Sequence, residues 1–122
     1  MKLTQLLHAT LLVADLARSR DFYEAVLGLR PNPQRPQMAF DGAWYDIGVC
    51  QIHLMCLPNP EAGLARPAHG GRDRHLALAV SDMAELRARL DQAGVAYNLS
   101  QSGRVALFCR DPDDNTLEFV QG

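Results

Sequence analysis

The sequence repeats one short pattern in its two halves. The segment HATLLVADL at residues 8–16 aligns with HLALAVSDM at residues 75–83, which begins 67 positions later. In each copy a histidine opens a short apolar run that ends at an aspartate, Asp15 or Asp82. Self-similarity of this kind is typical of a chain built from copies of one supersecondary unit. It constrains the fold strongly, because both halves should then share one architecture.

A helix is predicted after each of the two aspartates. Asp15 and Asp82 are suitable N-caps, because a short carboxylate accepts hydrogen bonds from the free amides of a first helical turn. Glu85 adds capping-box spacing to the second helix. We expect the helices at about 16–27 and 83–93. Gly28 and Gly94 suit their ends, since glycine tolerates a left-handed C-terminal conformation.

Three strands are predicted after each helix, from short apolar or alternating runs separated by turn signals. The turn signals are Asp41-Gly42, Gly48, Ser102-Gly103 and the segment 111–115. The expected strands are 38–40, 43–47 and 50–55 in the first half, and 96–99, 104–109 and 116–120 in the second. Each half then reads as strand, helix and three strands, so the predicted fold class is α+β with two βαβββ modules.

A segment rich in proline and glycine separates the two halves. Such a density of breakers indicates a connector. Because the 122 residues are close to the common domain size, we expect one domain over 1–122. It consists of module one at about 1–57, the connector at about 58–73 and module two at about 74–122. One module alone exposes a sheet face, so two modules must pair, within the chain or across a dimer.

The composition excludes several classes of protein. Twelve basic and 14 acidic residues give a net charge of -2, which provides no electrostatic footprint for nucleic acid. No apolar run approaches the roughly 20 residues of a membrane span. The opening residues 1–4 lack the apolar region of a signal peptide, so we expect a cytoplasmic protein. The three cysteines do not suggest a disulfide framework.

Candidate metal ligands fall at equivalent positions of the two repeats. Side chains alternate across a strand, which places His8 and His75 on the face away from the bulkier apolar residues. The last strand of each module carries His53 or Glu118, 65 positions apart. Each module therefore offers one candidate on its first strand and one on its last, and pairing the modules face to face can bring all four together. His69 lies among connector glycines and is expected at the surface.

Imidazole nitrogens and a carboxylate suit Zn, Fe, Mn, Ni or Co. We therefore predict that His8, His75 and Glu118 bind a divalent metal, and the residues leave open whether His53 is a further ligand. The competing interpretation is that each histidine is an ordinary half-buried strand residue and that Glu118 is a solvated residue of an edge strand.

With these motifs the chain resembles the vicinal oxygen chelate superfamily, which includes glyoxalases, bleomycin resistance proteins, fosfomycin resistance proteins and extradiol dioxygenases. The residues that carry the resemblance are His8 with the following LLVAD, Phe22-Tyr23 with Leu27-Gly28, His75 with LALAVSD, and DPDDNTLEF at 111–119. They extend over nearly the whole chain. Asp114 departs from the pattern, because the family most often has glycine at this turn; aspartate tolerates left-handed geometry well.

The resemblance implies curled mixed sheets that form a cup around a divalent metal. His8, His75 and Glu118 match metal-binding positions of the enzymes, and His53 matches the remaining module position. Small members of the family are commonly homodimers whose sites are built from both subunits. The tyrosine of fosfomycin resistance proteins is missing, with Phe108 in its place.

A metal with open positions can chelate two adjacent substrate oxygens and act as a Lewis acid. We therefore expect a metal-dependent, lyase- or isomerase-like enzyme acting on a small molecule, with Glu118 or a metal-bound water as the base. The alternatives are a non-catalytic binding or resistance protein, a ring-cleaving dioxygenase and a thiol transferase. Arg104, Phe108 and Trp44 are the candidate substrate contacts, since Arg104 can clamp a carboxylate or phosphate. Equally, Arg104 can be solvated after a turn and Trp44 can belong to the core.

Overall fold

The computed structural model describes residues 1–122, which divide into two compact units, Met1–Asn59 and Pro60–Gly122. Each unit contains one mixed sheet and one helical segment that follows the first strand. The α+β fold class with two βαβββ-like modules, predicted from the repeat, is confirmed. Neither helix has the length and apolar character that crossing a bilayer requires.

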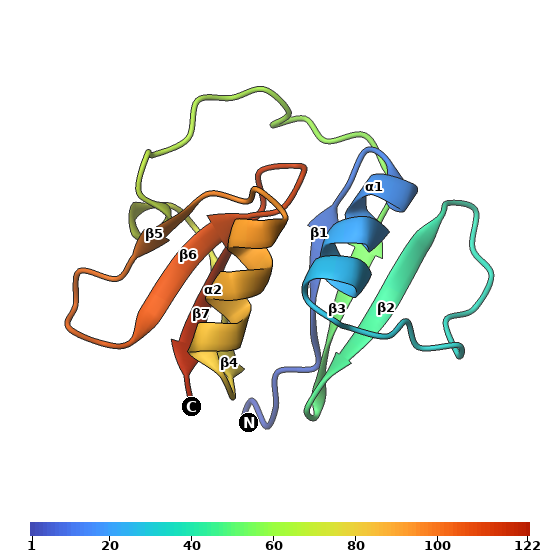
Figure 1. Ribbon diagram of the computed structural model, residues 1–122. Helices are drawn as coiled ribbons and strands as arrows, with labels where there is room; N and C mark the ends of the chain where they lie inside the picture. The colour runs from blue at the N-terminus through green and yellow to red at the C-terminus, as the bar shows by residue number, and fades with distance from the viewer. The chain divides into compact units, whose positions relative to one another are not determined.

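The first unit is a three-stranded sheet with a helical segment on one face (Figure 1). Its strands are β1 (His8–Leu12), β2 (Gly42–Ile47) and β3 (Cys50–Met55), in the order β1-β3-β2. β1 runs parallel to the central β3, and β2 runs antiparallel to it. The core consists of side chains from the helical segment and from alternate strand positions, and its fully buried members are Val13, Tyr23, Tyr45, Ile52 and Leu54.

The predicted helix at 16–27 changes its winding half-way along. An α-helix, α1 (Leu16–Arg20), is capped by the Asp15 carboxylate and continues as a π-helix, η1 (Asp21–Val26). The amide of Leu27 donates to the carbonyl of Phe22, five residues earlier. The chain then leaves the helix at Gly28, whose φ of 78° is the left-handed value that glycine accepts without strain.

The predicted strand at 38–40 is wrong, because these residues form no sheet ladder. Pro31 instead makes an isolated bridge with Tyr45 beside β2. The segment before β2 contains Pro31, Pro33 and Pro36, which have no N–H to donate to a neighbouring strand. The first unit therefore has one strand fewer than the second.

The second unit contains the complete set of four strands. They are β4 (Leu76–Val80), β5 (Tyr97–Leu99), β6 (Ala106–Arg110) and β7 (Thr116–Gln121), in the order β4-β7-β6-β5. The only parallel pair is β4 with β7. The helix α2 (Met83–Gln92) is capped by Asp82, and its stripe of Met83, Leu86 and Leu90 is buried.

Two turns of the second unit bear on the sequence predictions. The strand predicted at 104–109 begins two residues later, so Arg104 lies in the preceding turn. Asp114 adopts a φ of 64°, as expected for an aspartate in the place of a turn glycine. The Asp111 carboxylate accepts hydrogen bonds from the amides of Asp113 and Asn115 and stabilises this turn.

Candidate metal centre

In the first unit, three aromatic rings are stacked on the sheet face opposite the core. His53 on β3 is paired in register with Trp44 on β2 and with Thr10 on β1. The ring of His53 lies 4.2 Å from that of Trp44, at an interplanar angle of 6°. On its other side it lies 4.0 Å from the ring of His8, at 12°. The structure thus brings His8 and His53 together, with Trp44 beside them.

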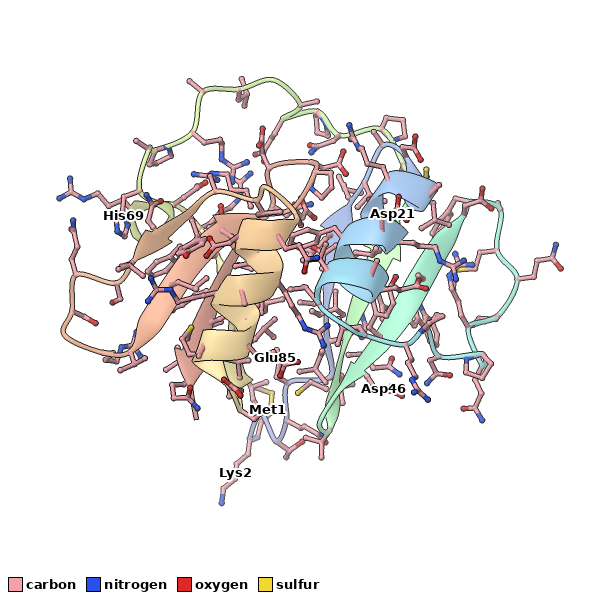
Figure 2. All side chains as sticks on the ribbon, viewed as in Figure 1. Met1, Lys2, Asp21, Asp46, His69 and Glu85 are labelled. Atoms are coloured by element: carbon pink, nitrogen blue, oxygen red, sulfur yellow. The ribbon has the colours of Figure 1, made fainter.

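A hydrogen-bond chain fixes the tautomer of the neutral His53 ring. The Asp46 carboxylate, labelled in Figure 2, accepts hydrogen bonds from Asn32 Nδ2 at 3.2 Å and from Gln51 Nε2 at 2.8 Å. Gln51 Oε1 is therefore an acceptor, and His53 Nε2–H donates to it at 2.8 Å. The lone pair of the neutral ring is then on Nδ1. Sequence reasoning missed this chain, because no pattern links Asn32 to strands β2 and β3.

Burial lowers the pKa of His53, and the positive charges of His8 and Arg35 lower it further. The ring is thus biased toward the neutral form, which is the form that binds metals. An open cavity of about 580 Å³ lies against this stack and is lined by His8, Trp44, Gln51, His53 and neighbouring residues of the turn between β2 and β3.

In the second unit, His75 and Glu118 face each other. His75 Nδ1 lies 2.8 Å from the main-chain carbonyl oxygen of Asp73, which can only accept, so Nδ1 carries the proton. The other nitrogen, Nε2, lies 3.3 Å from Oε1 of Glu118. In the neutral ring this places a nitrogen lone pair against a carboxylate oxygen. Two acceptors in this geometry repel each other unless a proton or a metal ion lies between them.

Glu118 is buried, with 3% of its surface exposed, and its second oxygen is held by Arg104. Arg104 Nη2 donates to Glu118 Oε2 at 2.9 Å, while the arginine side chain remains 58% exposed. Phe108 is paired with Glu118 across β6 and β7, and its ring meets the ring of His75 edge-on at 5.2 Å. The predicted site residues of this half therefore lie together.

The connector covers part of this sheet face. It contains a short 3-10 helix, η2 (Gly70–Arg72), whose Gly70 packs against Phe108 and Thr116. His69 (Figure 2) lies at the N-terminus of η2, half-buried, with its ring 5.4 Å from that of Phe108. Its Nδ1 accepts from the amide of Gly71, and its Nε2 donates to the carbonyl of Leu99. His69 is thus a capping residue with both nitrogens engaged.

A part-buried charge cluster lies at the end of the connector. Oδ2 of Asp73 accepts hydrogen bonds from Arg66 Nε at 2.8 Å, Arg110 Nη1 at 2.7 Å and Thr116 Oγ1 at 3.2 Å. Burial by itself would raise the pKa of Asp73, but hydrogen bonds from Arg110 and Arg66 lower it to about 2. Sequence reasoning missed this cluster, since Arg110 and Thr116 are far from Asp73 in the chain and the residues form no motif.

The residues present fit a divalent metal in their chemistry. Imidazole and carboxylate groups are the ligands that borderline metals such as Zn²⁺ and Mn²⁺ accept. Two of the predicted ligands lie together in each unit, His8 with His53 and His75 with Glu118. Neither unit alone brings together three His, Cys, Asp or Glu side chains that could hold a metal ion.

Comparison with known proteins identifies the family. The model of the glyoxalase/bleomycin resistance protein/dioxygenase superfamily matches residues 5–119. This chain belongs to that superfamily. The match includes all four predicted ligand positions and confirms the resemblance that the repeated motifs indicated.

Two curated relatives support this membership. The superfamily member described here is 31% identical over 123 residues to "Glyoxylase I 4" from Arabidopsis thaliana, covering 97% of this chain and 71% of the relative. It is 30% identical over 128 residues to the lactoylglutathione lyase of Haemophilus influenzae, covering 96% and 92%. These values indicate distant homology to glyoxalase I.

A solved structure shows the same superfamily fold. It is a mutant of the fosfomycin resistance protein FosX from Listeria monocytogenes, complexed with Mn(II) and 1S,2S-dihydroxypropylphosphonic acid. The TM-score is 0.76 at 18% sequence identity, over 99% of this chain and 94% of the other. At this identity the likeness shows a shared fold.

Proposed function

We propose that this superfamily member is a divalent-metal-dependent enzyme of the lyase or isomerase type. Its substrate is a small molecule that chelates the metal through two adjacent oxygens. His8, His75 and Glu118 are the proposed ligands, with His53 as a fourth, and Zn, Ni, Mn, Fe and Co all suit this set. The observation that carries the proposal is the approach of His75 Nε2 to Oε1 of Glu118 at 3.3 Å.

As the fourth ligand, His53 is restricted to one of its two ring nitrogens. Its Nε2–H is donated to Gln51, so it binds through Nδ1 unless that hydrogen bond breaks. His75 needs no hydrogen bond to break, because its Nδ1–H is donated to the Asp73 carbonyl and Nε2 is the nitrogen that would bind the metal. This is the arrangement that metal-binding histidines commonly show, with the outer nitrogen held by an acceptor.

Glu118 is the proposed catalytic residue. When bound, the metal supplies Lewis-acid stabilisation of the negative charge that develops on a substrate oxygen. Glu118 would take the proton from the carbon adjacent to the carbonyl carbon that bears this oxygen, and the C–H electron pair would move through the carbonyl onto the oxygen. Oε1 would accept the proton and leave the metal for this step, while Arg104 keeps Oε2 in place. Its burial excludes bulk water, which strengthens its electrostatic interactions with the substrate.

The three predicted substrate contacts differ in what they offer. The Arg104 side chain is 58% exposed, so its guanidinium can bind a carboxylate or phosphate group of the substrate by its planar fork. Trp44 borders the open cavity of the first unit and can contact an apolar part of the substrate. Phe108 is 6% exposed and offers little surface to a substrate. Its proposed role is to pack against the His75 ring and keep that ring in place beside the bound substrate.

We further propose that the chain is one domain that functions as a homodimer, with sites built from both subunits. Apolar side chains are exposed at the N-terminus and at the turn between β2 and β3, where Leu6, Leu7 and Val49 have 64–82% of their surface exposed. The N-terminal segment lies beside the start of β3, since Gln51 N–H donates to the Leu7 carbonyl. Apolar surface of this kind suits a second copy of the chain. Light scattering after size exclusion tests this, and a monomer at working concentration contradicts it.

Metal content tests the proposed function directly. Protein purified without a nickel column is expected to contain stoichiometric metal, and the His75→Ala variant is expected to contain none. His69→Ala is the matched control, because His69 belongs to the same unit but has both nitrogens hydrogen-bonded. Metal-free wild-type protein that gains no thermal stability with Mn, Fe, Ni, Co or Zn would contradict the proposal.

A second candidate is a binding or resistance protein that sequesters its ligand without catalysis. The stack of Trp44, His53 and His8 beside an open cavity of about 580 Å³ favours it, because that volume is within the usual range for small-molecule sites. Saturable binding of a planar aromatic compound to metal-free protein, unchanged by His75→Ala, would support this candidate over the enzyme.

A further inference from the structure

The main chain just before β4 determines the direction of the His75 ring. His75 precedes the first residue of β4, and its Nδ1–H donates to the Asp73 carbonyl two residues earlier. Neither residue lies in a β-strand, so no sheet ladder fixes this carbonyl. His8 differs, since it belongs to β1 and is paired with Gln51.

We propose that Asp73 is a positioning residue for the metal centre: its carboxylate, clamped by Arg66 and Arg110, fixes the carbonyl that holds His75 Nδ1–H and so aims Nε2 at Glu118. The inference rests on the proposed function and assigns the charge cluster at the end of the connector a role in it. Asp73 contacts neither substrate nor metal and acts only through His75.

The cluster joins the connector to the hairpin of β6 and β7. Arg66 comes from the connector, whereas Arg110 is on β6 and Thr116 on β7, and all three donate to Oδ2 of Asp73. Arg110 also donates from Nη2 to the Pro67 carbonyl at 2.6 Å. The Asp73, Arg66 and Arg110 side chains are 8%, 17% and 23% exposed. Ion pairs with so little solvent contact hold a fixed geometry better than surface pairs do.

The main chain around Asp73 is constrained on both sides of the carbonyl. The amide of Asp73 donates to the Gly70 carbonyl at 3.1 Å, and the amide of Arg74 donates to Asp73 Oδ1 at 2.9 Å. The peptide that accepts His75 Nδ1–H is therefore held from its own side chain and from η2. The side-chain clamp sets the His75 tautomer before a metal binds, and outer partners of this kind tune metal affinity.

Asp73→Asn is the test, because it keeps the shape of the side chain and removes its charge. In metal-free variant protein at alkaline pH, nitrogen NMR of the His75 ring is expected to show loss of the exclusive Nδ1–H tautomer. Zn²⁺ affinity is expected to fall roughly tenfold. Glu24→Gln is the matched control, since Glu24 is a part-buried carboxylate held by Arg20 in the other unit; it is expected to leave both readouts unchanged.

Three outcomes separate the possibilities. A folded Asp73→Asn variant with the wild-type tautomer and wild-type Zn²⁺ affinity overturns the inference. If Asp73→Asn does not fold, Arg66→Gln removes one of the three donors to Oδ2 and is expected to shift the tautomer in the same direction to a smaller extent; an unchanged tautomer there also overturns it. If wild-type protein binds no metal, the proposed function fails, while the tautomer measurement still decides whether Asp73 positions His75.

Discussion

Replacing Gly70 with alanine measures how tightly the connector packs on the sheet of the second unit. The new Cβ would lie 2.8 Å from Cβ of Phe108 and 2.9 Å from Cγ2 of Thr116. Both neighbours are buried strand residues. Cβ of Phe108 cannot move without displacing its strand, and rotating Cγ2 of Thr116 away would break the hydrogen bond from Oγ1 to Asp73. Overpacking of this kind costs about 1–3 kcal/mol, whereas alanine restricts the unfolded chain and returns about 0.4–1 kcal/mol. We expect the free energy of unfolding to fall by about 1–2 kcal/mol.

Urea unfolding of the wild type and the Gly70→Ala variant gives this difference in unfolding free energy. It is obtained from the shift in the midpoint urea concentration when the dependence of the free energy on urea is the same in both proteins. Gly71→Ala is the matched control in the same turn. The three atoms nearest to its Cβ would be ring atoms of His69 and Phe108, at 3.1–3.2 Å, and these can yield by small rotations. A Gly70→Ala variant as stable as the Gly71→Ala variant would refute the tight packing of η2 on Phe108 and Thr116.

Further predictions concern other parts of the chain. Burial would raise the pKa of Glu24, but hydrogen bonds, above all that from Arg20, lower it below 4.5. The stabilisation from the ionised carboxylate is then complete above the unfolded-state pKa and lost as the pH falls through the folded-state pKa. Glu24→Gln should therefore lower the free energy of unfolding at neutral pH and lower it much less in acid. An equal loss of unfolding free energy at both pH values contradicts this. Burial raises the pKa of Cys109 to about 12, so a thiol reagent at neutral pH should modify the two half-buried cysteines only, and rapid reaction of all three contradicts the burial. Trp44 is the only tryptophan and stacks on His53. Zn²⁺ added to metal-free protein should therefore change the tryptophan fluorescence. Unchanged fluorescence under saturating metal argues against ligation by His53.

The repeat and the strand alternation predicted most of the architecture. Asp15 and Asp82 cap their helices as expected, because N-capping is a local interaction that sequence spacing reveals. Glu118 and Phe108, predicted as a metal ligand and a substrate contact, are paired by the register of β6 and β7. The strand at 38–40 failed because its short apolar run resembled a strand, whereas the edge of β2 is taken by Pro31, bridged to Tyr45, and by Asn32, whose N–H donates to the Trp44 carbonyl.

The finer structure of the site depends on contacts that sequence patterns do not encode. The hydrogen-bond chain from Asn32 through Asp46 and Gln51 to His53 joins a loop to two strands. Likewise, Asp73 receives Arg66 from its own connector and Arg110 from β6, 37 residues later. Such contacts follow from tertiary packing, so composition and periodicity carry no signal for them. The stacking of Trp44 on His53 could have been predicted once β2 and β3 were paired in register.

The central claim is that residues from both modules bind one metal ion, and a comparison of two substitutions tests it most directly. Zn²⁺ is titrated into metal-free wild type and into His8→Ala and His75→Ala variants, with His69→Ala as the control. We predict one ion per chain in the wild type and the control, and a loss of affinity of more than roughly a hundredfold in each of the other two. Unchanged binding by His8→Ala, with loss only in His75→Ala, would show a site confined to the second module and contradict the claim.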